Sequence, residues 1–302
     1  MVTAFSPVLL VIRDPDGRHH AARAADDSAP LFDSVSPDTP LVSALDLGVT
    51  RGDGVFETIT VVNGIPQALD AHLTRFARSA SMLELPPPHW HTWKSSVLAA
   101  IDSRQAVAEA FVKLVYTRGI EGTGVPTGWI HLQQSADFTA ERVGGIRVVL
   151  LDRGYASSVQ HTSPWLLQGA KTLSYAVNRA AAREAARRGA DDVIFVSSDG
   201  YLLEGPTATV VLKLNNMFVT PQTENGILPG TTQESLFEIA TVNGYRTAYE
   251  MLTPADLHRA ECAWLVSSVR NAAPIREIDG EPRPFDAELT EAINAGLAAR
   301  TN

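Results

Sequence analysis

The sequence predicts a mixed α/β protein built from two domains. Its 302 residues suffice for two domains of roughly 150 residues each. Short β-branched runs alternate along the chain with segments whose apolar residues recur at helical spacing, a mixture typical of α/β and α+β folds. The stretch 126–145 is weakly patterned and separates the two halves. We therefore expect a smaller N-terminal domain over residues 1–136, a linker over 137–144 and a larger C-terminal domain over 145–302.

The N-terminal half is expected to hold a sheet and two helices. Side chains alternate between two faces over 55–62, and Asn63-Gly64 is a typical hairpin turn, so this segment predicts a strand that leads into another. Apolar residues at helical spacing precede three prolines and predict a helix. The expected strands are 8–12, 55–62 and 111–117, the expected helices are 70–83 and 93–107, and a polar loop covers 19–36.

The C-terminal half is expected to alternate strands and helices more densely. Gly189 and Gly244 follow two helical patterns and are typical of helix ends. Thr231 and Glu234 have the spacing of a capping box at the start of another helix. The expected strands are 146–151, 192–197, 201–203, 207–214, 217–219 and 262–267, and the expected helices are 174–188, 231–243 and 288–297.

The composition argues against several functional classes. Lys plus Arg is 25 and Asp plus Glu is 34, so the net charge is −9; a chain without a basic run binds nucleic acid poorly, because that binding depends on neutralising phosphates. The single cysteine, Cys262, excludes an internal disulfide and a cysteine-based zinc site. No apolar run reaches the roughly 20 residues of a membrane span, and residues 1–7 lack a signal-peptide pattern. We therefore expect a cytoplasmic enzyme without metal, membrane or nucleic-acid partners.

Lysine is scarce, and one lysine stands out. Only Lys94, Lys113, Lys171 and Lys213 occur among 25 cationic residues. A lysine amine deprotonates when its surroundings lower its pKa, so lysine, unlike arginine, can form a Schiff base. Lys171 has small uncharged neighbours just before a predicted helix, which suits a binding cleft or a solvated loop equally well. The glycine spacing around it does not match a Walker phosphate loop, and Lys113 lies in a predicted strand where it could face solvent.

Other residues have the chemistry to bind anions or a protonated base. A Pro-Gly turn leads into the helix expected at Thr231, where N–H groups and hydroxyls form an anion site; taken alone, a plainly capped helix start is the commoner explanation. Glu204 lies between apolar segments, so we expect it either to meet a cation or strong donor or to be exposed at a turn. Arg75 and Arg118 could each bind phosphate or carboxylate through two N–H groups.

Taken together, these residues resemble the fold-type IV pyridoxal-phosphate enzymes, which include aminodeoxychorismate lyase and the branched-chain and D-amino-acid aminotransferases. The resemblance extends from Leu47 to Gly280. The order and spacing of its motifs are more specific than any single motif. The motifs are Arg51-Gly52-Asp53-Gly54-Val55-Phe56-Glu57-Thr58, His72-Leu73-Thr74-Arg75-Phe76, Lys171, Glu204-Gly205, Leu228-Pro229-Gly230-Thr231-Thr232, and Ser267-Ser268 ahead of Pro274.

The resemblance implies a role for each matching residue. Lys171 would bind pyridoxal phosphate as a Schiff base and then act as the general base at the substrate Cα. Glu204 would pair with the pyridine nitrogen and keep it protonated. The other implied cofactor-binding residues are Arg75, Thr231, Thr232 and Ser268 at the phosphate, Leu228 against the ring and Tyr175 beside it. The family fold also implies a cofactor in the cleft between the two domains, and a homodimer.

The choice of reaction depends on the substrate pocket. The loop 118–124 resembles the glycine-rich loop of the lyases, and it lacks the Arg-x-His pair with which D-amino-acid transaminases bind carboxylate. Phe56 stands where those transaminases have a tyrosine, and Ser268-Val269 departs from the Gly-Thr pair of branched-chain enzymes. We expect Phe56, Arg118 and Arg270 to bind substrate, with Arg270 at a carboxylate.

These features favour a pyridoxal-phosphate-dependent 4-amino-4-deoxychorismate lyase, which releases 4-aminobenzoate and pyruvate in folate biosynthesis. The alternative in the same family is an aminotransferase that acts on D-amino acids or branched-chain amino acids. An alternative of another class is a non-catalytic protein that binds pyridoxal phosphate or phosphate. The intact set of Lys171, Glu204 and Arg75 argues against that last alternative.

Overall fold

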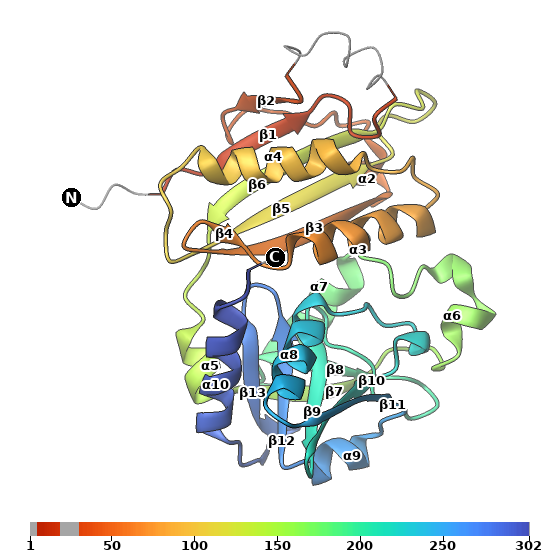
Figure 1. Ribbon diagram of the computed structural model, residues 1–302. Helices are drawn as coiled ribbons and strands as arrows, with labels where there is room; N and C mark the ends of the chain where they lie inside the picture. The colour runs from red at the N-terminus through yellow and green to blue at the C-terminus, as the bar shows by residue number, and fades with distance from the viewer. Residues whose placement is uncertain (1–4, 19–29, 302) are drawn as a thin grey trace. The chain divides into compact units, whose positions relative to one another are not determined.

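The computed structural model describes residues 5–18 and 30–301, and it divides into two compact units. Unit 1 comprises residues 1–136, 170–174 and 301–302, and unit 2 comprises residues 137–169 and 175–300. Each unit has a sheet and helices of its own (Figure 1). The predicted mixed α/β class is therefore confirmed. Residues 170–174, which we expected in the C-terminal domain, belong to unit 1.

Unit 1 is built on a six-stranded antiparallel sheet with the strand order β2-β1-β6-β5-β3-β4. The strands are β1 (Val8–Ile12), β2 (Phe32–Val35), β3 (Gly54–Val62), β4 (Ile65–Pro66), β5 (Glu109–Thr117) and β6 (Thr127–Gln134). The helices are α2 (Leu47–Thr50), α3 (Leu69–Met82) and α4 (Trp90–Asp102). Residues 19–29 of the polar loop predicted over 19–36 lie outside the described residues. The prediction is wrong at its end, because residues 32–35 pair with β1 as an edge strand.

Helices α3 and α4 cover one face of this sheet (Figure 1). Phe76 of α3, Trp93 of α4 and Tyr116 of β5 form an aromatic cluster there, with 4.8 Å between the ring centres of Phe76 and Trp93 and 5.8 Å between those of Trp93 and Tyr116. Side chains alternate along a strand, so Val55 and Glu57 of β3 point into this core while the residue between them points to the other face.

Unit 2 is built on a mixed sheet with the order β11-β10-β9-β12-β13-β7-β8, to which β14 adds beside β13. The strands are β7 (Ile146–Asp152), β8 (Asp192–Val196), β9 (Thr209–Leu214), β10 (Met217–Pro221), β11 (Arg246–Glu250), β12 (Cys262–Ser267), β13 (Asn271–Ile278) and β14 (Glu281–Pro282). The helices are α5 (Thr139–Gly144), α6 (Val159–Thr162), α7 (Ala176–Arg187), α8 (Thr231–Val242), α9 (Pro254–Arg259) and α10 (Ala287–Ala298), with short 3₁₀ turns at Pro164–Leu166 and Thr223–Asn225.

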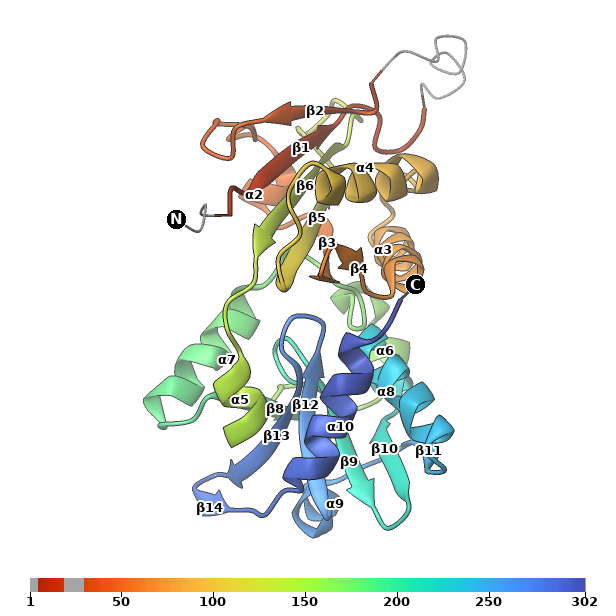
Figure 2. The ribbon, with the colours of Figure 1, turned by 60° about the vertical axis from the view of Figure 1, so that its left-hand side comes forward.

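Both faces of the central strands of unit 2 are buried. Helices α8 and α10 lie against β12 and β13 (Figure 2), where Trp264 and Leu297 belong to one apolar cluster. Neighbouring residues of the same strands, such as Leu265 of β12 and Ala273 of β13, belong to a second cluster on the opposite face. This explains why the run 262–267 is continuously apolar. No helix among the described residues is long and apolar enough to cross a membrane.

The weakly patterned stretch 126–145 is structured, unlike the linker that its composition predicts. It contains β6, in which Gly128, Ile130 and Leu132 are buried in alternation. Glycine and glutamine in this strand hide an alternation that is present in the sequence. Residues 137–144 include α5, which packs against β13, so this segment belongs to the body of unit 2.

Candidate active site

Lys171 is held in place by strand-like pairing with β3. The N–H of Phe56 donates to the carbonyl oxygen of Lys171 at 3.0 Å, the N–H of Leu173 donates to that of Gly54 at 2.8 Å, and Thr172 forms an antiparallel bridge with Val55. A Cβ at position 54 would lie 2.8 Å from Leu173 Cδ1, so glycine in the Asp53-Gly54 turn gives this segment room to approach. The segment is ordered by backbone pairing, which a solvated loop would lack.

A second contact fixes the same lysine from a helix. The backbone N–H of Lys171 donates to Oγ of Ser79, a buried residue of α3, at 3.1 Å. The Lys171 amine lies 4.7 Å from the ring centre of Phe56, within the range of a cation–π contact. The lysine is therefore anchored at its backbone and directed along one aromatic face.

Phe56 also contacts a second amine, that of Lys113 on β5. The Lys113 Nζ lies 5.1 Å from the ring centre, and Lys113 is paired in the sheet with Thr58 and with His131. Within the described part of the chain, this half-buried amine has no ion pair or hydrogen bond. Burial lowers the pKa of Lys113, and burial together with the charge of Lys113 lowers the pKa of His131. Lys113 thus faces the same ring as Lys171.

Under β3, a buried network joins Glu57, His72 and Arg75. Glu57 is 0% exposed and Arg75 is 8% exposed. The Nε and Nη2 atoms of Arg75 donate to the two carboxylate oxygens of Glu57 at 2.7 and 2.8 Å. This bidentate geometry is the strongest form of a carboxylate–guanidinium pair, and it fixes one edge of the Arg75 guanidinium.

The charges of this network follow from its burial. Burial alone would raise the pKa of Glu57, but the charge and hydrogen bonds of Arg75, with those of His72, hold it well below its ordinary value. Burial lowers the pKa of His72 and outweighs the nearby carboxylate. His72 is therefore neutral, and its Nδ1 carries the proton that is donated to Glu57 Oε2 at 2.8 Å. The network holds one negative and one positive charge, both inside the core.

In unit 2, helix α8 begins in a way that differs from the predicted capping box. Its N-cap is Gly230, which offers no side chain, and Thr231 is already the first helical residue. A Cβ at Gly230 would lie 2.3 Å from Thr209 Oγ1, so a Ser or Asn cap does not fit. The first N–H groups of a helix have no carbonyl four residues earlier to donate to. The buried Thr232 contacts Ser268 through their hydroxyl oxygens at 3.4 Å.

Glu204 lies close to the loop that leads into α8. The N–H of Leu228 donates to its carboxylate at 3.2 Å, and its backbone pairs with β8 through Phe195. Tyr175, just before α7, donates its hydroxyl to the carbonyl oxygen of Pro206 at 2.5 Å, and burial raises the pKa of that hydroxyl. Unit 2 therefore brings together Glu204 and Leu228, and separately Thr232 and Ser268.

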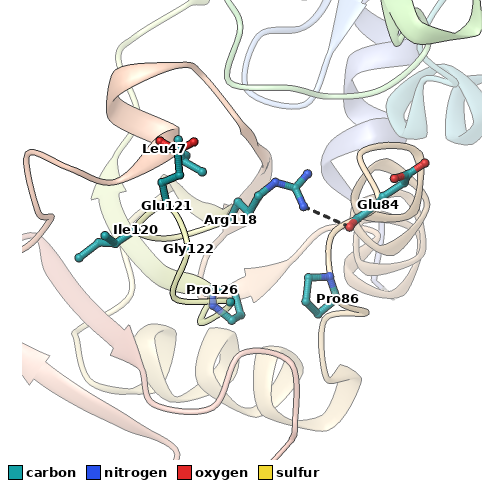
Figure 3. Close-up of a pocket in the computed structure, with 9 residues that line it drawn as sticks. Leu47, Glu84, Pro86, Arg118, Ile120, Glu121, Gly122 and Pro126 are labelled. Atoms are coloured by element: carbon teal, nitrogen blue, oxygen red, sulfur yellow. Dashed lines mark hydrogen bonds between the residues drawn. The ribbon is translucent and has the colours of Figure 1, made fainter.

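The two arginines predicted to bind substrate both have carboxylate partners. Arg118 lines a pocket of about 460 Å³ beside the loop 120–124 (Figure 3). Its guanidinium donates to Asp53 at 2.6 Å and to the carbonyl oxygen of Glu84 at 3.3 Å. Arg270 donates to Asp192 at 2.7 Å. Their substrate contacts stay predictions. No group of His, Cys, Asp and Glu in the residues that the structure describes is arranged to hold a metal ion.

Sequence reasoning missed four side chains of unit 1 that surround the predicted residues: Glu57, His72, Ser79 and Lys113. The signal for Glu57 was present, because it shares a strand face with Val55, Ile59 and Val61, and a carboxylate there needs a buried partner. Nothing local in the sequence pairs Ser79 or Lys113 with Lys171. Those contacts depend on the sheet register and on the approach of residues 170–174.

We expect Glu57→Gln to destabilise the protein by about 3–5 kcal/mol, because it leaves the buried Arg75 charge without its carboxylate. The matched control is Asp70→Asn on α3, the helix that carries Arg75. It removes an exposed pair with Lys94 and should cost no more than about 1 kcal/mol. Urea unfolding followed by circular dichroism measures both changes.

The same carboxylate predicts a pH dependence. Its pKa is lowered on folding, so its stabilisation is complete above the pKa of an unfolded glutamate, about 4.3, and decreases as pH falls below that value. Glu57→Gln should therefore be less sensitive to acid than the native protein between about pH 5 and 3. Parallel acid sensitivity in the two proteins would contradict this assignment.

Comparisons with known proteins agree with these features. A model of the amino-transferase class IV family matches residues 54–278. The chain is 41% identical over 278 residues to a bifunctional aminodeoxychorismate lyase / D-amino acid transaminase of Mycobacterium tuberculosis, a match that covers 88% of this chain and 96% of that protein.

Two solved structures extend the agreement. A fold IV-transaminase from Curtobacterium pusillum shares 52% sequence identity at a TM-score of 0.92, covering 98% of this chain and 100% of that one. The pyridoxal-phosphate-bound form of a hypothetical aminotransferase from Mycobacterium tuberculosis shares 41% identity at a TM-score of 0.84, covering 88% and 96%. The chain therefore belongs to the class IV amino-transferase family and is a fold-type IV enzyme that uses pyridoxal phosphate.

Proposed function

We propose that this enzyme is a 4-amino-4-deoxychorismate lyase that releases 4-aminobenzoate and pyruvate. The loop 118–124, which resembles the glycine-rich loop of the lyases, favours this reaction. The pair of amines at one aromatic ring, with Lys171 at 4.7 Å and Lys113 at 5.1 Å from the centre of Phe56, suits a substrate that carries a carboxylate. The Lys171 amine acts as the base, and the Lys113 amine binds a carboxylate of the substrate.

By their chemistry, the residues implied by the resemblance match the groups of pyridoxal phosphate. Lys171 supplies the amine that attaches the aldehyde carbon, and Glu204 supplies the carboxylate for the pyridine nitrogen. The start of α8 supplies N–H groups and hydroxyls for the phosphate, since Gly230 leaves that helix without a side-chain cap. The remaining proposed cofactor contacts are Arg75 and Ser268 at the phosphate, Leu228 at the ring and Tyr175 beside it.

Each residue then has a defined task. The cofactor, when bound, supplies an electron sink for the pair of electrons left at Cα. The Nζ of Lys171 removes the Cα proton. The buried Glu57 fixes the Arg75 guanidinium in one orientation, and this preorganisation reduces the entropy lost on binding an anion.

Lys113 is proposed to bind a substrate carboxylate. A half-buried ammonium with no ion pair in the described residues costs free energy, and an incoming carboxylate would offset that cost. Both 4-amino-4-deoxychorismate and amino acids carry the required carboxylate. This assignment is also compatible with Arg118 and Arg270, which already have the carboxylates of Asp53 and Asp192 as partners.

A second candidate activity is transamination of D-amino acids. It is favoured by the 41% identity to a protein described as both a lyase and a D-amino acid transaminase, and by the 52% identity to a fold IV-transaminase. Both reactions begin with removal of the Cα proton by the same lysine, so the same residues serve either. Branched-chain amino acids are a further substrate class for this second activity.

Lys171→Ala should abolish turnover and remove the visible absorbance of the attached cofactor, because no other amine replaces it. The assay mixes the holoenzyme with 4-amino-4-deoxychorismate and measures the 4-aminobenzoate released. Release by the native protein alone supports the lyase. Absence of release, with D-alanine or D-glutamate converted to its keto acid, would reject the lyase in favour of transamination. Turnover retained in the variant would reject Lys171 as the base.

Lys113→Met should raise the substrate KM by about 10- to 100-fold, because a charge-assisted hydrogen bond to a carboxylate contributes roughly 1.5–3 kcal/mol. The absorbance of the bound cofactor should be unchanged. The matched control is Lys213→Met, which removes a lysine paired with Glu261 at the surface and should leave KM unaltered. An unchanged KM in Lys113→Met would remove this residue from the substrate site.

The family resemblance also implies a homodimer, which we propose for this chain. It is supported by exposed apolar side chains on α2, just before it and on the adjoining loop 118–126, namely Val49, Leu45, Ile120 and Val125. Sedimentation equilibrium should give twice the mass of the chain. A single-chain mass at micromolar concentration would contradict the proposal.

A further inference from the structure

The turn between β12 and β13 carries Ser268 and is held by side chains from other elements. Arg142 of α5 donates through Nε to the carbonyl oxygen of Arg270 at 2.9 Å and through Nη2 to that of Val269 at 3.1 Å. Asn294 of α10 accepts from the N–H of Ala272 and donates to its carbonyl oxygen, both at 2.9 Å. The turn is therefore more constrained than a hairpin loop held only by its own strands.

Arg270 adds a third attachment, to β8. Its Nη2 donates to Asp192 Oδ2 at 2.7 Å, and the other oxygen of that carboxylate accepts from the N–H of Val193 at 2.8 Å. The two side chains are 13% and 10% exposed, so the pair is shielded from solvent. Such a pair is strongly destabilised when one partner is removed, because the other is left buried and charged.

This ion pair connects two parts of unit 2 that no strand ladder joins directly. The sheet order places β13 and β7 between β12 and β8. Strand β8 also supports Glu204, since Phe195 donates its N–H to the carbonyl oxygen of Glu204 at 3.0 Å and accepts from Leu203 at 2.8 Å. The pair therefore connects the Ser268 turn to β8, the strand with which the backbone of Glu204 pairs.

The Arg270 side chain is also an expensive choice for packing alone. Its Nε–H is buried and has no hydrogen-bond partner among the residues that the structure describes. An unsatisfied buried donor is destabilising, and an aliphatic side chain at 270 would avoid it. The ion pair to Asp192 is the interaction that an aliphatic residue could not make.

We propose that Arg270 and Asp192, together with Arg142, are positioning residues that hold the Ser268 hydroxyl beside Thr232 at the start of α8, where it receives the cofactor phosphate. This inference rests on the proposed phosphate site of α8 and Ser268. It assigns Arg270 a task other than the substrate carboxylate expected from the sequence. The hydroxyls of Ser268 and Thr232 are 3.4 Å apart, so a displaced turn would separate two donors that serve one phosphate.

The test compares two cofactors that differ only in the phosphate. The full chain carrying Arg270→Gln, Asp192→Asn or both is loaded with pyridoxal phosphate or with pyridoxal, and the dissociation constant of each is measured by absorbance. We expect about a tenfold weaker affinity for pyridoxal phosphate in each single variant and in the double variant, because either change breaks the same pair. The affinity for pyridoxal should change less than twofold.

Two further variants separate positioning from general destabilisation. Arg147→Gln removes the exposed pair with Asp191, one residue before Asp192, and should leave both affinities unaltered. Ser268→Ala should weaken the binding of pyridoxal phosphate but not of pyridoxal. Arg270→Gln added to it should weaken binding little further, because Arg270 acts through Ser268.

Several outcomes would overturn the inference. One is an unchanged affinity of Arg270→Gln for pyridoxal phosphate. Another is an equal loss for pyridoxal phosphate and pyridoxal, which would indicate a structural role only. A third is a raised substrate KM with unchanged cofactor affinity, which would indicate that Arg270 binds the substrate carboxylate. If the native protein bound pyridoxal as tightly as pyridoxal phosphate, the proposed phosphate site itself would fail.

Discussion

The backbone pairing between residues 171–173 and the start of β3 is the constraint on which the candidate site depends. It determines the position of Lys171, the lysine with small uncharged neighbours, and it places the amine of that lysine against the ring of Phe56. The pairing requires a close approach that Gly54 permits. It also uses the edge of β3 opposite to β5, which β4 occupies only at the far end of the strand. One strand thus organises the lysine, its aromatic neighbour and the buried Glu57.

The alternation of β3 divides its chemistry between two faces. Phe56 faces the amines of Lys171 and Lys113, while Glu57, the next residue, holds a guanidinium and a neutral imidazole inside the core. The buried charges are costly, and three side chains with matching donors and acceptors compensate that cost. A polar network of this kind is rigid, because displacement of one member leaves the others unsatisfied. The rigid network on the core face of β3 therefore helps to hold Phe56 in a fixed position on the opposite face.

Much of this arrangement was predictable from sequence, and the exceptions have physical causes. The motifs around Lys171, Glu204 and Thr231 identify the family because their chemistry needs those residue types, and local patterns located β1, β12 and α8 within a residue of their observed bounds. The strand β6 within the weakly patterned stretch 126–145 was missed because the first of its buried positions holds Gly128, where a typical strand has a larger apolar residue. The contacts of Ser79, Lys113 and Asp192 could not be predicted from the sequence, because they join residues that are far apart in the chain and depend on how the strands align. A capping box at Thr231 was wrong because the N-cap is Gly230, one residue earlier, and Thr231 is already helical.

The division of the chain into units has a consequence for how the gene can be cut. Residues 170–174 belong to unit 1, whereas the residues on either side of them belong to unit 2. A fragment ending at residue 136 would contain the sheet, Phe56 and the Glu57 network, but not the lysine that pairs with β3. A fragment starting at 137 would carry that lysine without the strand that orders it. Neither fragment is a self-sufficient module, so recombination between relatives is expected to succeed only when β3 and the Lys171 segment come from the same parent.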